Sequence, residues 1–110
     1  MNNDLIEKII QFRDDRDWKQ FHNPKDLAIS LSLEASELLE LFQWKTSDET
    51  VAKSLTEMRE ELADIIIYSV LFADIIGADI EEIISEKLEQ NNRKYPVEKA
   101  FGKKEKYTEL

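Results

Sequence analysis

The sequence predicts an all-α protein, a four-helix up-and-down bundle that assembles into an oligomer. Apolar residues recur at helical spacing, and capping residues flank four long segments. The 110 residues include only two Gly and two Pro, which argues against a β-sandwich, a barrel or a glycine-loop nucleotide fold. This length fits one domain over residues 1–110.

The first helix is expected over about residues 4–17, with Asn3 as its candidate N-cap. An aromatic connector follows at residues 18–22, and its composition indicates that it packs against another part of the protein. The second helix is expected to begin at Pro24, because Pro is favoured at the first helical position, and to continue to about Gln43.

The third helix is expected over about residues 47–76, as one kinked helix or as two, after a capping box that begins at Thr46. Residues 65–73 are apolar apart from one Ser, so this helix should lie at a bundle centre or an oligomer interface. They are too few for the about 20 residues that span a bilayer. We therefore expect no membrane association.

Gly77 is the expected C′ residue of the third helix, and Asp79 opens a fourth helix that runs to about Lys94. Pro96 stops that helix. Residues 97–110 are polar and Lys-rich, so we expect them to form a mobile tail.

Composition also excludes several functions. The chain has no Cys and one His, which excludes disulfides, thiolate zinc sites and multi-histidine metal sites. A formal net charge of −9 disfavours binding to nucleic acid or to an anionic membrane. The first residues lack the basic and apolar regions of a signal peptide, so a cytoplasmic location is expected.

Two pairs of acids lie inside apolar helical stripes, Glu34 with Glu37 and Glu61 with Asp64. One acid alone is more typical of a solvated helix face. Two pairs at the same spacing in apolar surroundings repel each other and are costly to desolvate without a partner. Oxygen ligands suit Mg²⁺ or Mn²⁺, so the pattern predicts a site that binds metal and phosphate together.

The fourth helix supplies cations. Residues 87–106 hold seven Lys or Arg against three acids. Cations near a helix C-terminus also complement the helix dipole, but Lys87 lies two turns earlier, on the core-facing stripe. Lys87 and Asn91 are therefore candidates for contacts to phosphate oxygens or to a base edge.

The aromatic residues allow two interpretations. Trp18, Phe21 and Trp44 are core aromatics, or they form a stacking pocket for a base. His22, the only His, is more typical of a packing or capping residue than of a catalyst.

An ordered set of motifs runs from residue 5 to about residue 102. It comprises residues 16–24 (RDWKQFHNP), Glu34–Glu37, residues 42–44 (FQW), Glu61–Asp64 and the K…N…KYP pattern of residues 87–96. This set resembles the signature of the MazG-like nucleotide pyrophosphohydrolases, ExxE…ExxD with its flanking motifs. The resemblance is closest to the compact branch that includes the dCTP pyrophosphatases.

The resemblance implies an enzyme that uses Mg²⁺, or Mn²⁺ in its place, to cleave a nucleoside triphosphate between its α and β phosphates. It assigns the metal to Glu34, Glu37, Glu61 and Asp64, with Glu34 or Glu37 orienting or deprotonating the attacking water. Residues implied to contact base and sugar are Trp18, His22, Trp44 and Tyr68; those implied to contact base or phosphates are Lys87, Asn91, Lys94 and Tyr95.

Members of this family are typically dimers or dimers of dimers, so a homodimer or homotetramer is expected. Their role is cleaning of the nucleotide pool. Ser36 stands where many dCTP-preferring relatives have Gly, which leaves open a preference for dCTP or for modified nucleotides.

Three other interpretations remain. A ferritin-like di-iron protein requires Glu-x-x-His, which is absent here. A phosphoribosyl-ATP pyrophosphohydrolase shares the fold but is disfavoured by the aromatic segments. A non-catalytic helical module that binds metal or nucleotide accounts for the amphipathic helices but not for the buried acids.

Overall fold

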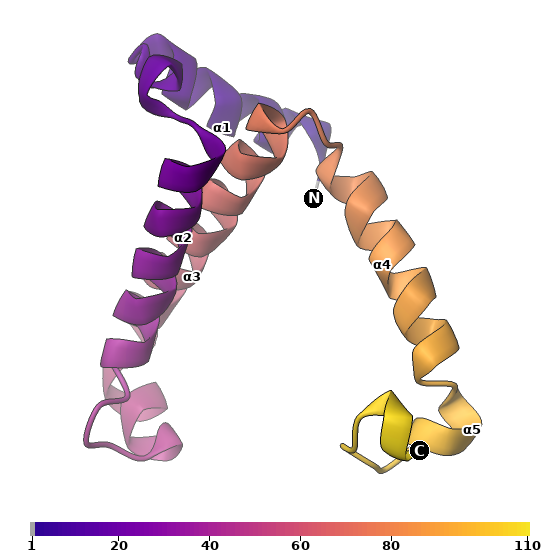
Figure 1. Cartoon of the computed structure of the whole chain (residues 1–110). Coiled ribbons are helices and arrows are strands. Elements are labelled where there is room, and N and C mark those ends of the chain that lie inside the picture. Colours follow the sequence, from indigo (N-terminus) through magenta and orange to yellow (C-terminus); the bar gives the residue numbers. More distant parts are fainter. Residues whose placement is uncertain (1) are drawn as a thin grey trace. The chain divides into compact units, whose positions relative to one another are not determined.

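The computed structural model describes residues 2–110, and these form helices and no strand (Figure 1). The elements are α1 (Asn3–Asp15), the 3₁₀ helix η1 (Trp18–Phe21), α2 (Pro24–Glu40), α3 (Ser47–Ile75), α4 (Ile80–Lys94), α5 (Val97–Ala100) and the 3₁₀ helix η2 (Tyr107–Glu109). The predicted all-α class is confirmed. The chain divides into two compact units, of which the first ends at Gly77 and the second begins at Ala78.

Two predicted helix boundaries are corrected, and one predicted connector holds a short helix. Asn2, not Asn3, caps α1, because its side chain accepts a 2.9 Å hydrogen bond from the Leu5 amide. The aromatic connector contains η1. The helix α2 ends at Glu40 instead of Gln43, since the next amides bond three residues back, which tightens the chain into turns.

The predicted signals around α3 are confirmed. Thr46 and Glu49 exchange both capping-box hydrogen bonds, of 3.1 and 3.4 Å. A kink lies at Ser54, where φ is −124° and ψ is 27°. Gly77 adopts a left-handed φ of 70° after the helix, a conformation that glycine reaches without steric cost. The Asp79 side chain then caps α4 by accepting from the Glu82 amide.

In the first unit, α2 and α3 pack side by side and antiparallel, and α1 lies against α3 (Figure 1). Among residues 2–110, the buried apolar side chains are Leu27, Val70, Leu71 and Ala73. They come from the start of α2 and the final turns of α3. The core of this unit therefore lies at the end of the α2–α3 pair that follows η1.

Arg13 of α1 is buried in this core, with 1% of its surface exposed. Its Nε donates to Asp14 Oδ1 at 2.9 Å and its Nη1 donates to Asp74 Oδ2 at 2.6 Å. Burial alone would lower the pKa of Arg13, but the hydrogen bonds and charges of Asp14 and Asp74 outweigh it and raise that pKa. The bond to Asp74 ties α1 to the last turn of α3.

The second unit contains α4, α5 and η2. Residues 81–90 of α4 are exposed throughout. Residues 97–110, for which the sequence predicts mobility, hold the two short helices α5 and η2. Across residues 2–110, none of the helices is both long and apolar enough to cross a membrane.

Removing Asp74 tests how α1 is held. Asp74→Ala leaves a buried guanidinium with Asp14 alone, so we expect the free energy of unfolding to fall by about 3 kcal/mol, the lower end for a broken buried ion pair. Asp14→Asn is the control, because Asp14 is more exposed and its loss should cost less than about 1 kcal/mol. Urea unfolding measures both, and equal losses would contradict this account.

Candidate active site

Three carboxylates from two helices meet in the first unit. One oxygen each of Glu34 on α2 and of Glu61 and Asp64 on α3 lie within 4.8 Å of one another. The packing of α2 against α3 brings these acids together; Leu33 and Ala35 adjoin Glu34 in the sequence, and Leu62 and Ala63 separate Glu61 from Asp64. Three of the four acids predicted from the sequence thus form a group with the dimensions of a metal site.

The fourth acid, Glu37, adjoins this group. Its negative charge raises the pKa values of both Glu34 and Glu61, which requires proximity to each. Glu37 itself is exposed. All four acids therefore converge, with Glu37 on the solvent side.

Two carboxylate oxygens of the group are buried without a hydrogen-bond partner, Glu34 Oε2 and Glu61 Oε2. Burial, followed by Glu37 and Glu34, raises the pKa of Glu61 from its usual value near 4.5 to about 7. Burial, followed by Glu37, also raises the pKa of Glu34. An ionised carboxylate oxygen can only accept a hydrogen bond. When it is buried, it therefore needs a donor, a proton of its own or a cation beside it, and these two oxygens have no donor. A divalent cation with oxygen ligands fits this donor set.

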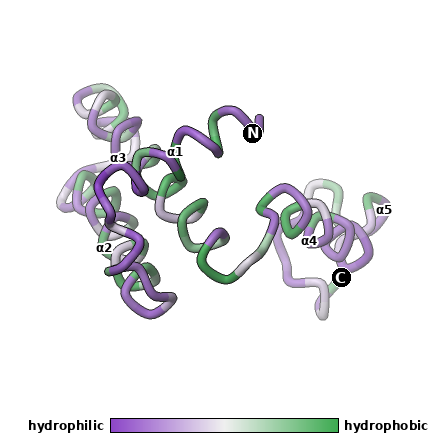
Figure 2. Tube along the Cα trace, turned by 90° about the horizontal axis from the view of Figure 1, so that it is seen from above, coloured by the Kyte–Doolittle hydropathy of each residue, from purple (hydrophilic) through white to green (hydrophobic). Residues whose placement is uncertain are grey.

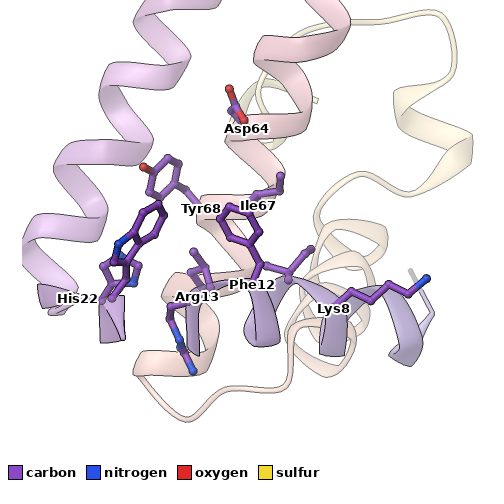
Figure 3. Close-up of a pocket in the computed structure, with 10 residues that line it drawn as sticks. Lys8, Phe12, Arg13, His22, Asp64, Ile67 and Tyr68 are labelled. Atoms are coloured by element: carbon purple, nitrogen blue, oxygen red, sulfur yellow. The ribbon is translucent and has the colours of Figure 1, made fainter. Parts of the chain in front are cut away.

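A cavity of about 350 Å³ borders the acids (Figure 3). Its walls come from α1, η1, the residue after η1 and α3, and they consist of Lys8, Ile9, Phe12, Arg13, Trp18, His22, Asp64, Ile67, Tyr68 and Leu71. Asp64 is a member of both the carboxylate group and the cavity wall. A ligand in this cavity therefore lies next to the acids.

Aromatic rings shape one side of the cavity. Phe12 and Trp18 pack edge to face, with ring centroids 5.7 Å apart and planes at 77°. The guanidinium of Arg16 lies 3.7 Å from the centroid of the Phe12 ring, within the range of a cation–π contact. These contacts hold rings of roughly the size of a nucleobase at the cavity before any ligand arrives.

His22 contributes a buried polar atom without a hydrogen-bond partner to the wall. Its Nδ1 is buried and makes no hydrogen bond. Burial, and then the charge of Arg13, lowers the pKa of His22. This shift favours the neutral imidazole, which offers one donor and one acceptor to a ligand.

The structure brings together only some of the residues predicted to bind substrate. Trp18, His22 and Tyr68 line the cavity. Trp44 does not, because it follows the opposite end of α2 from His22; it is 93% exposed and has a left-handed φ of 63°. Four further candidates lie on α4 and its C-cap in the second unit, namely Lys87, Asn91, Lys94 and Tyr95.

The sequence analysis missed the contribution of α1 to the cavity, above all Phe12 and Arg13. A signal was present, since Arg13 follows Ile9 by four residues and Ile6 by seven, which places a charge on the apolar stripe of α1. The same reasoning that identified Glu34 and Glu61 applies to it.

Comparison with known proteins identifies the family of the chain. Residues 29–110 match the MazG-like family. The chain is 38% identical to dCTP pyrophosphatase 1 of Mus musculus and 39% identical to that of Homo sapiens, in alignments that cover 91% of this chain but only 62% of each relative. The chain thus matches less than two thirds of the length of these relatives.

A solved structure is similar to this chain over most of its own length. It is the crystal structure of a pyrophosphatase from Archaeoglobus fulgidus DSM 4304, which is 41% identical, with a TM-score of 0.78 over 84% of this chain and 90% of that one. The family match, the sequence relatives and this structure point the same way. The chain belongs to the MazG-like family.

Proposed function

We propose that this chain is a nucleoside triphosphate pyrophosphohydrolase that requires Mg²⁺, or Mn²⁺ in its place, and yields a nucleoside monophosphate and pyrophosphate. In a cell such an enzyme removes unwanted nucleotides from the pool, and a cytoplasmic location belongs to the same proposal. The named relatives are dCTP pyrophosphatases, which supports a deoxynucleotide substrate.

The position of Asp64 is the observation that carries the proposal. This residue belongs to the carboxylate group and also lines the aromatic cavity. A nucleoside triphosphate has two matching parts: a base that would fit the aromatic cavity, and a triphosphate that binds metal and would lie at the carboxylate group. A base in the cavity would leave the phosphates beside the acids.

The acids Glu34, Glu37, Glu61 and Asp64 would hold the cation. When bound, a divalent cation offsets the phosphate charge and lowers the pKa of a coordinated water. The chain carries a net charge of −9, so a bound cation would also reduce the repulsion between the chain as a whole and a triphosphate. The two unpartnered buried oxygens, Glu34 Oε2 and Glu61 Oε2, support this assignment.

The hydrolytic step needs an acceptor for one proton of water. Water oxygen bonds to one of the two phosphorus atoms of the α–β bridge, the bridging P–O bond breaks, and monophosphate and pyrophosphate separate. Glu34 or Glu37 orients the water and takes its proton. Exposure of Glu37 at the edge of the group favours it for this role, because water reaches it freely.

The base would lie against Trp18 and Tyr68, with His22 as the polar partner of its edge. Ser36, the departure from dCTP-preferring relatives, does not line the cavity, and its hydroxyl donates to the Ser32 carbonyl oxygen at 3.0 Å. The substitution therefore presents no new polar group to the base. This supports dCTP as the first substrate to test, with modified nucleotides next.

We also propose a homodimer or homotetramer. Hydrophobic residues recur along α2 and α3 (Figure 2), and both helices leave apolar side chains exposed one turn apart. Leu33 and Leu62 are 58% and 51% exposed. Contact with a second copy would cover such residues. Through the same contact, Trp44 would reach the nucleotide bound by the other copy.

The direct experiment measures pyrophosphate release from a panel of nucleoside triphosphates with Mg²⁺ and with a chelator. We expect monophosphate and pyrophosphate in equal amounts when Mg²⁺ is present, and neither product when the chelator is present. Release of inorganic phosphate would contradict the cleavage position. Binding of metal and nucleotide without turnover would instead identify the chain as a non-catalytic binding module.

The raised pKa of Glu61 predicts a pH dependence of the metal-free protein. Because that pKa is about 7 instead of 4.5, the folded state keeps a proton that the unfolded chain releases between these values. The free energy of unfolding should therefore fall as pH rises across this interval. Glu61→Gln should flatten most of this fall in urea titrations.

A divalent metal ion should restore the free energy of unfolding that is lost as pH rises, because it binds the ionised acids. At about pH 8, Mg²⁺ should raise the melting temperature of the wild type but not of Glu61→Gln, which should also lack turnover. Glu57→Gln, at an exposed position on α3, is the matched control and should behave as the wild type. An unchanged turnover in Glu61→Gln would refute the metal site.

The two Trp side chains give a test of nucleotide contact. Trp18→Ala should weaken nucleotide binding by about 1–3 kcal/mol if the ring stacks on the base. Trp44→Ala should do the same without lowering the melting temperature of the protein, because the side chain is 93% exposed. Calorimetric titration with thermal unfolding separates the two effects, and unaltered affinity in Trp44→Ala would exclude that residue from the site.

The oligomer proposal predicts that a charge on the exposed apolar face weakens assembly. Leu33→Lys should shift the sedimentation coefficient toward that of a monomer, because a buried ammonium at an interface lacks a partner. Glu57→Lys introduces the same charge at a polar exposed position and should leave the mass unchanged. A wild-type monomer at micromolar concentration would contradict the proposal.

A further inference from the structure

The carboxyl-terminal residues of the second unit fold back onto the end of α4. Pro96 ends the helix, α5 follows, and Gly102 takes a left-handed φ of 75° that helps the chain to reverse. Tyr107 at the start of η2 then meets Tyr95, the C-cap of α4, edge to face at 6.0 Å and 83°. Two aromatic rings thus join the last residues of the chain to the last turn of α4.

The folded-back ring also contacts Lys94. The Nζ atom of Lys94 lies 5.0 Å from the centroid of the Tyr107 ring, within the range of a cation–π attraction. In residues 2–110, no carboxylate forms an ion pair with Lys94, whereas its neighbour Arg93 pairs with Glu89 at 3.2 Å. The ammonium of Lys94 is therefore held by an aromatic face and not by an acid.

This difference matters for a cation that binds phosphate. A carboxylate would hold the ammonium but also neutralise its charge, and phosphate would have to compete with it. An aromatic face restricts the long side chain and leaves the positive charge available. Since Lys loses much rotamer freedom on binding, restriction in advance lowers the entropic cost of the contact.

We propose that Tyr107 is a positioning residue, whose ring, packed against Tyr95, holds the Lys94 ammonium ready for a phosphate of the nucleotide substrate. The inference rests on the proposed function, because it takes the ligand of Lys94 to be a nucleoside triphosphate. It gives residues 97–110 a role other than that of a mobile tail. Tyr107 itself makes no contact with substrate in this account.

The test compares KM and kcat for dCTP with Mg²⁺ in full-length variants. Tyr107→Leu removes the aromatic face and should raise KM about three- to tenfold with little change in kcat, the range expected for a modest cation–π contact. Tyr107→Phe keeps the face and should restore a KM near that of the wild type. Thr108→Ala, in the same 3₁₀ helix, is the control for local disturbance and should leave KM unchanged.

A double-variant cycle assigns the effect to Lys94. In the Lys94→Gln background, Tyr107→Leu should raise KM no further, because the group that it positions is absent. An equal rise in both backgrounds, an unchanged KM in Tyr107→Leu, or failure of Tyr107→Phe to restore KM would each overturn the inference. In those cases the wild type still turns over dCTP, whereas a wild type inactive on every triphosphate would overturn the proposed function as well.

Discussion

Repulsion among carboxylates between α2 and α3 is the constraint on which the first unit depends. Glu34, Glu61 and Asp64 bring oxygens within 4.8 Å, and Glu37 stands beside them. Two of these oxygens are buried with no partner, at a cost that the metal-free fold has to bear. Proteins keep such costs where function requires them and recover the stability elsewhere.

The contrast with Arg13 shows that the fold can satisfy a buried charge. This guanidinium is almost wholly buried, and Asp14 and Asp74 both accept hydrogen bonds from it. The acids of the cluster have no comparable partner. The ion pair of Arg13 with Asp74 holds α1 against α3. The carboxylate group lacks such a partner, and a divalent cation would neutralise its negative charge. The same unit therefore contains one buried charge with partners inside the fold and one acidic group without them.

Much of the fold was predictable because its signals are local. Asn23, Thr46 and Asp79 cap helices where the sequence predicts, since a side-chain acceptor three residues before an amide needs no tertiary contact. The end of α2 was not predictable. Leu41, Phe42 and Gln43 are adequate helix formers, so local propensity does not predict the turns that their amides make three residues back. The buried Thr50 packs beside these turns, and its hydroxyl lies 3.0 Å from the Thr46 carbonyl oxygen and 3.4 Å from that of Leu41.

In the candidate site, too, some residues were predictable from local signals and others were not. Helical periodicity was enough to place Glu34 and Glu61 on facing stripes, because both lie on long regular helices. Nothing local places α1 over the end of α3, so the contributions of Phe12 and Arg13 to the cavity emerged only from the packed structure. Trp44 was also not predictable, because helical periodicity indicates neither its 93% exposure nor its left-handed φ.

The central claim is that the acids and the cavity form one site joined at Asp64. Anomalous diffraction from crystals grown with Mn²⁺ and a non-hydrolysable analogue of dCTP tests it most directly. The account predicts a manganese peak among Glu34, Glu61 and Asp64, with the phosphates on the metal and the base against Trp18 and His22. Manganese bound elsewhere, or a base outside the cavity, would contradict it.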